Sequence, residues 1–137
     1  MILVTPYVNS QNRANMHAVS LQRLTKANPY LQRVMKQAAI GCPVDIEISE
    51  VLRTLARQTE LVKAGASTMD SRHLTGHAVD FYVTVGGKVA WGWPLYVIAG
   101  THIKKVAAEL HIEIVWGGDF RIFKDRSHIE LNRKFYP

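Results

Sequence analysis

The chain nearly lacks cysteine: Cys42 is the only one among 137 residues. An intramolecular disulfide is therefore excluded, as is any metal site built from several thiolates. The zinc deaminases are excluded too, because their P-C-x-x-C motif needs two cysteines. Cys42 lies between a helical and an extended pattern and is followed by Pro43, and a free cysteine in such a place is usually a small buried residue. We therefore expect Cys42 to be buried and to take no part in catalysis.

Long apolar runs and low-complexity segments are also absent. No run of about 18 apolar residues occurs, so the sequence predicts no transmembrane helix. The opening residues, MILVTPYVNSQNR, have neither a basic start nor a sufficient apolar segment, and we expect no secretory signal. Because no repeat or linker is visible, we expect residues 1–137 to form one domain without an appended module, with residues 1–19 as an irregular N-terminal segment.

Negative charge is scarce relative to positive charge. The formal net charge is +6 and the isoelectric point is near 9.7, which favours a polyanionic partner such as nucleic acid, an anionic membrane surface or the polymers of a bacterial envelope. The basic residues are scattered, however, and no recognition-helix pattern, zinc-finger spacing or RNP-type aromatic run occurs. We therefore expect no nucleic-acid partner. No exposed apolar stripe is evident, so we also expect a monomer.

The apolar spacing predicts a mixture of helices and strands. Helices are predicted around 21–24 and at 29–39, 54–65 and 94–110, and extended segments at 44–51, 77–85, 88–91, 112–116 and 127–131. In the helix at 54–65, Leu61 and Val62 are expected to face inward, and Pro94 is expected at the first helical position of the last helix. This order predicts an α+β domain with a small, mainly antiparallel sheet flanked by helices.

An aspartate stands in the middle of the most β-prone segment. In HAVDFYV, Val79, Phe81 and Val83 share one face of the strand while Asp80 lies on the other. A carboxylate in so apolar a strand is costly unless it is paired or binds a metal ion. The alternative is an edge strand on which Asp80 faces water.

Two histidines can join this aspartate. His73 lies in the loop that leads into the same strand, and His128 heads the strand SHIEL, although a single strand histidine is more often an ordinary residue. His77 is an odd number of residues from Asp80, so we interpret it as a surface or second-shell histidine. Two imidazoles and one carboxylate suit a catalytic Zn²⁺ whose fourth position is open to water.

Two further residues have the chemistry that such a site needs. Asp125 precedes His128 by three residues and is a candidate general base toward a metal-bound water. Arg53 lies between a strand and a helix N-terminus and is our candidate for stabilising negative charge on the scissile carbonyl, the alternative being a solvated or salt-bridged arginine. The motifs H-E-x-x-H, G-x-x-x-x-G-K-[ST], G-x-S-x-G and G-x-G-x-x-G are all missing. Local chemistry thus permits a zinc site of another kind.

Four segments together resemble a known family. SRHLTGHAVD at 71–80 is similar to the S-x-H-x-x-G-x-A-x-D signature of the VanY-type D-alanyl-D-alanine carboxypeptidases, and DRSH at 125–128 is similar to their second motif. RTLARQ at 53–58 resembles the segment that supplies their substrate-binding arginine, and WGGD at 116–119 resembles the stretch before the second motif. All four occur in the family's order over roughly residues 20–134, and within the family the short single-domain form resembles bacteriophage L-alanyl-D-glutamate endopeptidase lysins.

This resemblance implies a fold and a set of site residues. The fold is the mixed α+β fold shared by the hedgehog signalling domain and the D-Ala-D-Ala peptidases. The implied roles are Zn²⁺ ligation by His73, Asp80 and His128, catalysis by Asp125 and Arg53, and substrate binding by Arg53, Gln58 and Ser71. Glu130 shares a strand face with His128 and is either a second-shell group that orients this histidine or a plain strand residue.

The implied activity is hydrolysis of the L-Ala–D-Glu bond in the stem peptide of bacterial peptidoglycan. The alternatives are a D-Ala-D-Ala carboxypeptidase and a non-catalytic, zinc-stabilised wall-binding domain. The missing secretory signal fits a phage lysin that waits in the host cytoplasm until a holin opens the inner membrane and then acts on the periplasmic wall. The basic charge fits the anionic cell envelope as a partner, and no separate wall-binding domain is expected.

Overall fold

The computed structural model describes residues 16–65 and 70–137. The helices are α1 (Ala18–Leu24), α2 (Pro29–Ala39), α3 (Leu55–Lys63) and α4 (Trp93–Glu109), with short 3-10 helices η1 (Arg72–Thr75) and η2 (Gly117–Asp119). The strands are β1 (Asp45–Glu50), β2 (Ala78–Val85), β3 (Lys88–Ala90), β4 (Ile114–Trp116) and β5 (His128–Leu131). None of the helices in this part of the chain is long and apolar enough to cross a membrane.

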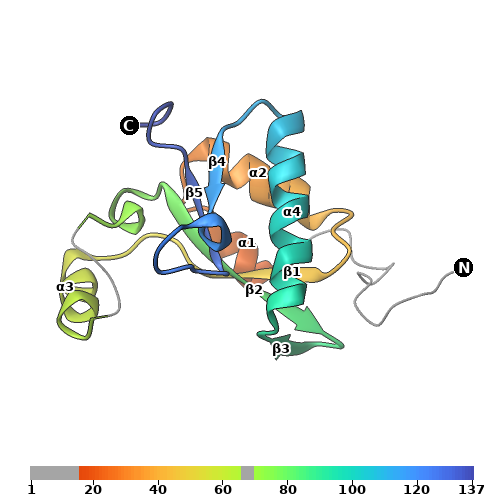
Figure 1. Ribbon diagram of the computed structural model, residues 1–137, viewed down its shortest axis with the longest axis horizontal. Coiled ribbons are helices and arrows are strands. Elements are labelled where there is room, and N and C mark those ends of the chain that lie inside the picture. Colours follow the sequence, from red (N-terminus) through yellow and green to blue (C-terminus); the bar gives the residue numbers. More distant parts are fainter. Residues whose placement is uncertain (1–15, 66–69) are drawn as a thin grey trace, which may run out of the picture.

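The strands form one antiparallel sheet, as the sequence predicted. Its order is β1-β2-β5-β4, and β3 pairs with β2 beside this path. All four strand pairings are antiparallel. Helix α4 contacts α2, β2 and β4, while α1 packs on β1 (Figure 1). The predicted α+β architecture with helices around a small sheet is confirmed.

The alternation of β2 explains which face of the sheet is covered. Val79, Phe81 and Val83 are completely buried, together with Ala99 and Ile103 of α4. Burial of each of the larger side chains, the valines, Phe81 and Ile103, contributes roughly 1.5–3 kcal/mol. Because side chains alternate along a strand, the same packing turns Asp80 to the opposite, open face of the sheet.

Three details differ from the sequence expectations. Residues 1–15 of the expected irregular segment lie outside the described residues, but Ala18 and Val19 already belong to α1, because Leu24 is buried there against the sheet. Helix α4 starts at Trp93, which puts Pro94 at its second position.

Helix α3 begins, as expected, after Thr54, whose side chain accepts a hydrogen bond from the backbone of Arg57.

The packing of α3 is the third difference. Leu61 and Val62 are only half-buried, whereas the one residue of this helix classed as buried is the polar Gln58. In Figure 1 α3 stands apart from the other helices, at the edge of the molecule. An apolar pair on such a helix has no second layer to pack against, so local periodicity overstated its burial.

Cys42 is buried, as the sequence predicted. Only 1% of the residue is exposed, and burial raises the pKa of its thiol to about 11. At neutral pH it is therefore a protonated, unreactive thiol.

Candidate metal centre

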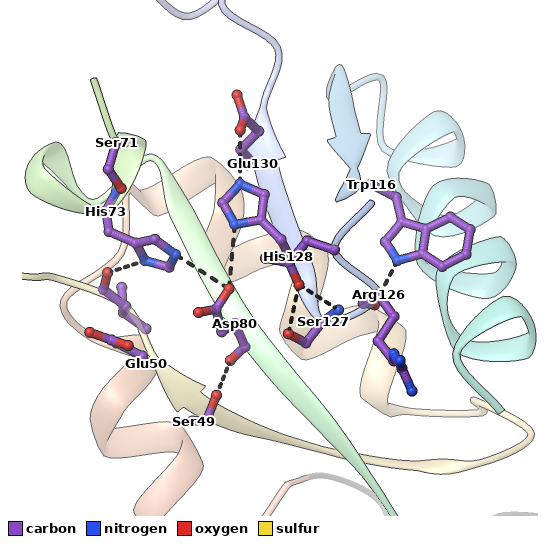
Figure 2. A network of polar contacts seen from close by, with 12 residues as sticks. Ser49, Glu50, Ser71, His73, Asp80, Trp116, Arg126, Ser127, His128 and Glu130 are labelled. Carbon is purple, nitrogen blue, oxygen red and sulfur yellow. Dashed lines mark hydrogen bonds and ion pairs between the residues drawn. The ribbon is translucent and has the colours of Figure 1, made fainter. Parts of the chain in front are cut away.

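The three predicted ligands meet on the open face of the sheet. Asp80 of β2 and His128 of β5 are direct cross-strand partners, and η1 brings His73 to the same point. One potential ligand atom from each of the three residues lies within 4.8 Å of the others. Figure 2 shows both imidazoles turned toward the Asp80 carboxylate. Among the described residues this is the one group of three or more His, Cys, Asp or Glu side chains gathered closely enough to hold a metal ion.

The position of His73 is determined by two hydrogen bonds. The Ser71 hydroxyl caps η1 by accepting from the His73 backbone N–H at 3.2 Å. The His73 ring is almost completely buried, and its Nδ1 donates to the Val51 carbonyl oxygen at 2.7 Å (Figure 2). This contact selects the tautomer in which Nε2 carries the lone pair. Nε2 faces Asp80 Oδ1 at 3.3 Å.

The ring of His128 is oriented in the reverse sense. Its Nε2 lies 2.8 Å from Glu130 Oε1 and its Nδ1 lies 3.4 Å from Asp80 Oδ1 (Figure 2). The two histidines therefore present different ring nitrogens to the same carboxylate oxygen. At metal sites, a ligating histidine commonly donates its other ring N–H to a carboxylate in this way, which orients the ring.

The electrostatics of the centre suit a cation between these groups. Burial alone would lower the pKa of His128, but its hydrogen bonds to Asp80 and Glu130 outweigh this effect and raise the pKa to about 9. Burial alone would raise the pKa of Asp80, but the polar and charge interactions with His128 and His73 hold the pKa of this carboxyl well below its usual range. The centre therefore attracts one proton near neutral pH, and the same three side chains could hold a divalent cation once that proton is lost.

The donor set fits a transition metal of the zinc type. Two neutral imidazole nitrogens and one carboxylate oxygen are a usual set for catalytic Zn²⁺, with the fourth position left to water or substrate. Both imidazoles have their second ring nitrogen bound to a protein acceptor, which directs the remaining lone pairs toward Asp80. The residues present therefore fit the group that the sequence predicted.

Arg53 lies beside the centre and is held firmly. Its Nε donates to Glu50 Oε1 and its Nη1 to Gln58 Oε1, both at 2.9 Å. Its Nη2 is 3.8 Å from Asp80 Oδ2, and its Nη1 is 3.5 Å from the Ser71 hydroxyl. The arginine is thus salt-bridged, and it also lines the cleft described next.

A cleft of about 560 Å³ opens over the three predicted ligands. Its lining residues are Glu50, Arg53, Arg57, Leu61, Asp70, Ser71, Arg72, His73, Asp80, Phe120, Ile122, Phe123, Asp125, His128, Glu130 and Arg133. Nearly all of the predicted site residues are therefore in one place. Gln58 is the exception, because it is completely buried behind Arg53 and is absent from the cleft wall.

Asp125 reaches the cleft from the loop between η2 and β5. The Ser127 backbone N–H and hydroxyl donate to Asp125 Oδ1 at 3.2 and 3.1 Å, so the direction of the carboxylate is fixed. The residue is exposed to solvent. A solvated carboxylate fixed in this way is able to exchange a proton with a water in the cleft.

The glycines of the WGGD segment explain how this loop comes so close. The Asp125 backbone N–H donates to the Gly117 carbonyl at 2.9 Å. A Cβ atom on Gly117 would lie 2.3 Å from the Asp125 carbonyl oxygen and 3.0 Å from His128 Cβ. Trp116 is buried beside them and its Nε1 donates to the Arg126 carbonyl at 2.8 Å (Figure 2).

Sequence reasoning missed several residues of this cleft. Glu50 is one, and a shift in the β1–β2 register between Ile48 and Glu50 makes it the partner of Asp80. Ile122 and Phe123 are others: they are highly exposed, at 72% and 91%, yet line the cleft. Their apolar character within the charged segment 121–126 was the available signal. His77 contacts Thr75 through a 2.7 Å hydrogen bond and is not a member of the ligand group.

Comparisons with known proteins place the chain among L-alanyl-D-glutamate peptidases by sequence similarity. A family model described as phage L-alanyl-D-glutamate peptidase matches residues 14–137. An L-alanyl-D-glutamate peptidase of Listeria phage A118 is 34% identical over 134 residues, covering 97% of this chain and 45% of that relative. One of Escherichia phage T5 is 29% identical over 122 residues, covering 85% of this chain and 88% of the relative.

A solved structure shows that the fold is also shared. The crystal structure of the Serratia marcescens L-Ala D-Glu endopeptidase ChiX matches with a TM-score of 0.87 and 38% identity, over 93% of this chain and 97% of that one. The chain spans just under half of the Listeria phage relative but nearly all of ChiX. Together with the family match over residues 14–137, these similarities show that the chain belongs to the phage L-alanyl-D-glutamate peptidase family.

Proposed function

We propose that this protein is a zinc-dependent peptidoglycan endopeptidase that hydrolyses the L-Ala–D-Glu bond of the stem peptide. The observation that carries the proposal is the gathering of His73, Asp80, His128 and Asp125 in one open cleft. Membership of the phage L-alanyl-D-glutamate peptidase family and the activity for which the relatives are named support the choice of bond.

We assign Zn²⁺ as the metal and His73, Asp80 and His128 as its ligands. Zn²⁺ bound by such a set polarises a carbonyl and lowers the pKa of water to about 7. The protein's part is to orient the ligands: Val51 holds His73 through Nδ1 and Glu130 holds His128 through Nε2. Glu130 is thereby a positioning residue in this proposal.

Asp125 is the proposed general base. Its carboxylate accepts a proton from the attacking water in the cleft and then donates it to the leaving amine of D-Glu. The two Ser127 donors keep one carboxylate oxygen fixed, so the group stays aimed during both transfers. Because Asp125 is exposed, its carboxylate is accessible to the water that it is proposed to deprotonate.

Arg53 is the proposed stabiliser of the negative charge that develops on the scissile carbonyl oxygen. A fixed donor aimed at such charge is a strong catalytic device, because it needs no reorganisation during the reaction. Glu50 and Gln58 fix the guanidinium group, and Ser71 lies at the edge of the same cluster. In this proposal Gln58 affects substrate only through Arg53, while Ser71 is able to contact it directly.

The cellular setting follows from the proposed substrate. We propose that the protein accumulates in the host cytoplasm and reaches the periplasmic wall when the inner membrane is opened by a holin. The net charge of +6 supports association with the anionic envelope. We further propose that it acts as a monomer, since the cleft is formed within one chain.

Mass spectrometry of digested peptidoglycan tests the proposal. Purified peptidoglycan is incubated with Zn²⁺-loaded protein and, in parallel, with protein kept in a chelator. Release of peptides that begin at D-Glu, with L-Ala left on the sugar and no release in the chelator, is the expected result. Loss of a terminal D-Ala alone would instead assign the carboxypeptidase reaction. An unchanged polymer in both samples would leave a zinc-stabilised wall-binding domain.

A further inference from the structure

A second hollow adjoins the cleft at Asp125. It measures about 400 Å³ and is lined by Trp91, Lys124, Asp125, Arg126 and Ser127. Asp125 lines both hollows. A substrate bound at Asp125 is therefore able to continue from the metal centre into this second space.

Trp91 gives this hollow an aromatic wall. The residue is 54% exposed although tryptophan is usually well covered. Its ring lies parallel to that of Tyr96, with 6° between the planes and 5.8 Å between centroids. The Trp91 carbonyl accepts a hydrogen bond from Arg126 Nη1, and the Arg126 guanidinium lies 4.8 Å from the ring of Trp93. The Trp91 ring is therefore held in place by Tyr96, and its backbone is bound to the loop that carries Asp125.

The opposite end of the cleft is rich in arginine. Arg53 precedes the N-cap of α3, and Arg57 lies in the first turn of that helix. Arg72 comes from η1, and Arg133 is bound to Asp70 at 2.7 Å next to Ser71. Figure 2 shows Ser71 and His73 on one side of Asp80 and His128, and Arg126 on the other. The metal centre thus lies between an arginine-rich end and an aromatic end.

The proposed substrate also has two chemically different ends, one on each side of the scissile bond. In peptidoglycan the amino group of L-Ala is joined to the lactyl group of N-acetylmuramic acid, while D-Glu and the diamino acid after it contribute carboxylates. The scissile bond therefore has a sugar on its L-Ala side and acidic groups on its D-Glu side. Carboxylates match arginine, and the apolar C–H face of a pyranose ring matches an exposed indole.

We propose that the hollow at Trp91 is a saccharide subsite that binds the N-acetylmuramic acid ring on the L-Ala side of the scissile bond. The Trp91 ring packs against the face of the sugar, and Lys124 and Arg126 offer donors to its hydroxyl and acetamido oxygens. The inference rests on the proposed endopeptidase function, and it makes the protein selective for stem peptides that are still attached to the glycan.

The test compares two substrates with one peptide sequence. One is the stem peptide carrying N-acetylmuramic acid and the other is the same peptide with a plain N-acetyl group. The ratio of their kcat/KM values measures recognition of the sugar. We expect the parent to prefer the muramoyl peptide and Trp91→Ala to lower this ratio about five- to tenfold, the size of an aromatic packing contact.

Matched variants separate recognition from damage to the fold. Phe135→Ala removes an aromatic residue of nearly equal exposure, 55%, that lines neither hollow, and should keep the parental ratio. Trp91→Phe keeps a flat ring and should keep most of the preference. Trp91→Leu keeps an apolar contact with Tyr96 without a flat ring, so it should lose the preference even if Trp91→Ala folds poorly.

Failure of the subsite and failure of the proposed function look different. If the parent cleaves both peptides at equal kcat/KM, or if the Trp91 variants slow both equally, the subsite is refuted and the endopeptidase function stands. If the parent cleaves neither peptide nor intact peptidoglycan, the proposed function fails and the subsite proposal falls with it.

Discussion

Each imidazole at the metal centre has one ring nitrogen bound to a protein acceptor. For His73 this acceptor is the Val51 carbonyl, and for His128 it is the Glu130 carboxylate. A charged acceptor makes the opposite nitrogen a better electron donor, whereas a carbonyl mainly orients the ring. Replacing Glu130 should therefore affect metal affinity more than losing the Val51 contact, although Glu130 lies outside the group of potential ligands.

Replacing Glu130 with glutamine should weaken metal binding. The amide still accepts the hydrogen bond from His128 Nε2 but brings no charge to increase the basicity of Nδ1. We expect Zn²⁺ affinity to fall about 10-fold or more, within the 10- to 100-fold range for outer-shell partners. Competition with a chromogenic chelator measures it.

Glu113→Gln is the control for Glu130→Gln, because Glu113 is an exposed glutamate on the neighbouring segment and is absent from the cleft wall. It should leave the affinity unchanged. Equal Zn²⁺ affinity for Glu130→Gln and the parent would show that Glu130 is a plain strand residue.

Asp125→Asn should abolish most of the activity while leaving metal binding intact. The amide preserves the shape of the side chain but cannot accept the proton of the attacking water. We expect kcat on the stem peptide to fall about 100-fold or more, with unchanged Zn²⁺ affinity because Asp125 is outside the ligand group.

Asp119→Asn is the comparison for Asp125→Asn, since Asp119 is exposed and its carboxylate is bound to Lys104 at 2.8 Å. This variant should retain kcat. Undiminished wall lysis by Asp125→Asn would remove the general-base assignment and mean that another group accepts the proton of the attacking water.

Some of these residues could be predicted from the sequence and others could not. The alternation around Asp80 and the phase of His128 indicate which strand face each side chain occupies, and this needs only local geometry. The family resemblance of the segment 53–58 implied that Gln58 contacts substrate, yet its side chain is completely buried. Its burial and the placement of Glu50 depend on how α3 and β1 meet, which no local pattern contains.

At the level of elements, the centre is a product of strand pairing. β2 and β5 are far apart in the sequence, and their register makes Asp80 and His128 direct partners. Apolar alternation predicted both strands but not their order in the sheet, because any two strands with one apolar face satisfy the same pattern. Helix α3 shows the converse error, since its apolar pair has no layer to cover it.

The turn η2 holds the Asp125 loop, and Gly117→Ala should disrupt it. The added Cβ would lie 2.3 Å from the Asp125 carbonyl oxygen, which is backbone and is not free to swing aside. The loop must therefore move away from His128. We expect kcat to fall roughly 100-fold, the cost of a displacement of about 1 Å. Cleavage of the N-acetylated stem peptide by metal-loaded protein measures it.

Gly92→Ala is the matched control for this turn. A Cβ there meets only Pro94 Cδ at 3.9 Å and Leu95 Cδ1 at 4.0 Å, an ordinary contact. We expect parental activity on the same peptide and the same circular dichroism spectrum for both variants. Full activity of Gly117→Ala would mean that the loop tolerates the shift and that its present position is not required.

For the whole molecule, the centre joins β2, β5 and η1, and the stability of this junction depends on whether His128 carries a proton. Without metal, the proton on His128 is held by Asp80 and Glu130, and its pKa in the folded protein is about 9 against 6.5 for an ordinary histidine. A raised pKa stabilises the folded state fully below pH 6.5, and this stability is lost as the pH rises through about 9.

The metal-free protein should therefore be less stable at pH 9.5 than at pH 6.5, by up to about 3 kcal/mol. Zn²⁺ bound by these side chains would replace the proton on His128, so the loaded protein should lose much less stability over the same pH range. Urea unfolding at both pH values, with chelator and with Zn²⁺, measures the difference. His128→Asn in chelator lacks the titrating group, so its free energy of unfolding should change less between the two pH values. If the metal-free parent is equally stable at both, the strong pairing of His128 with the two carboxylates does not exist in solution.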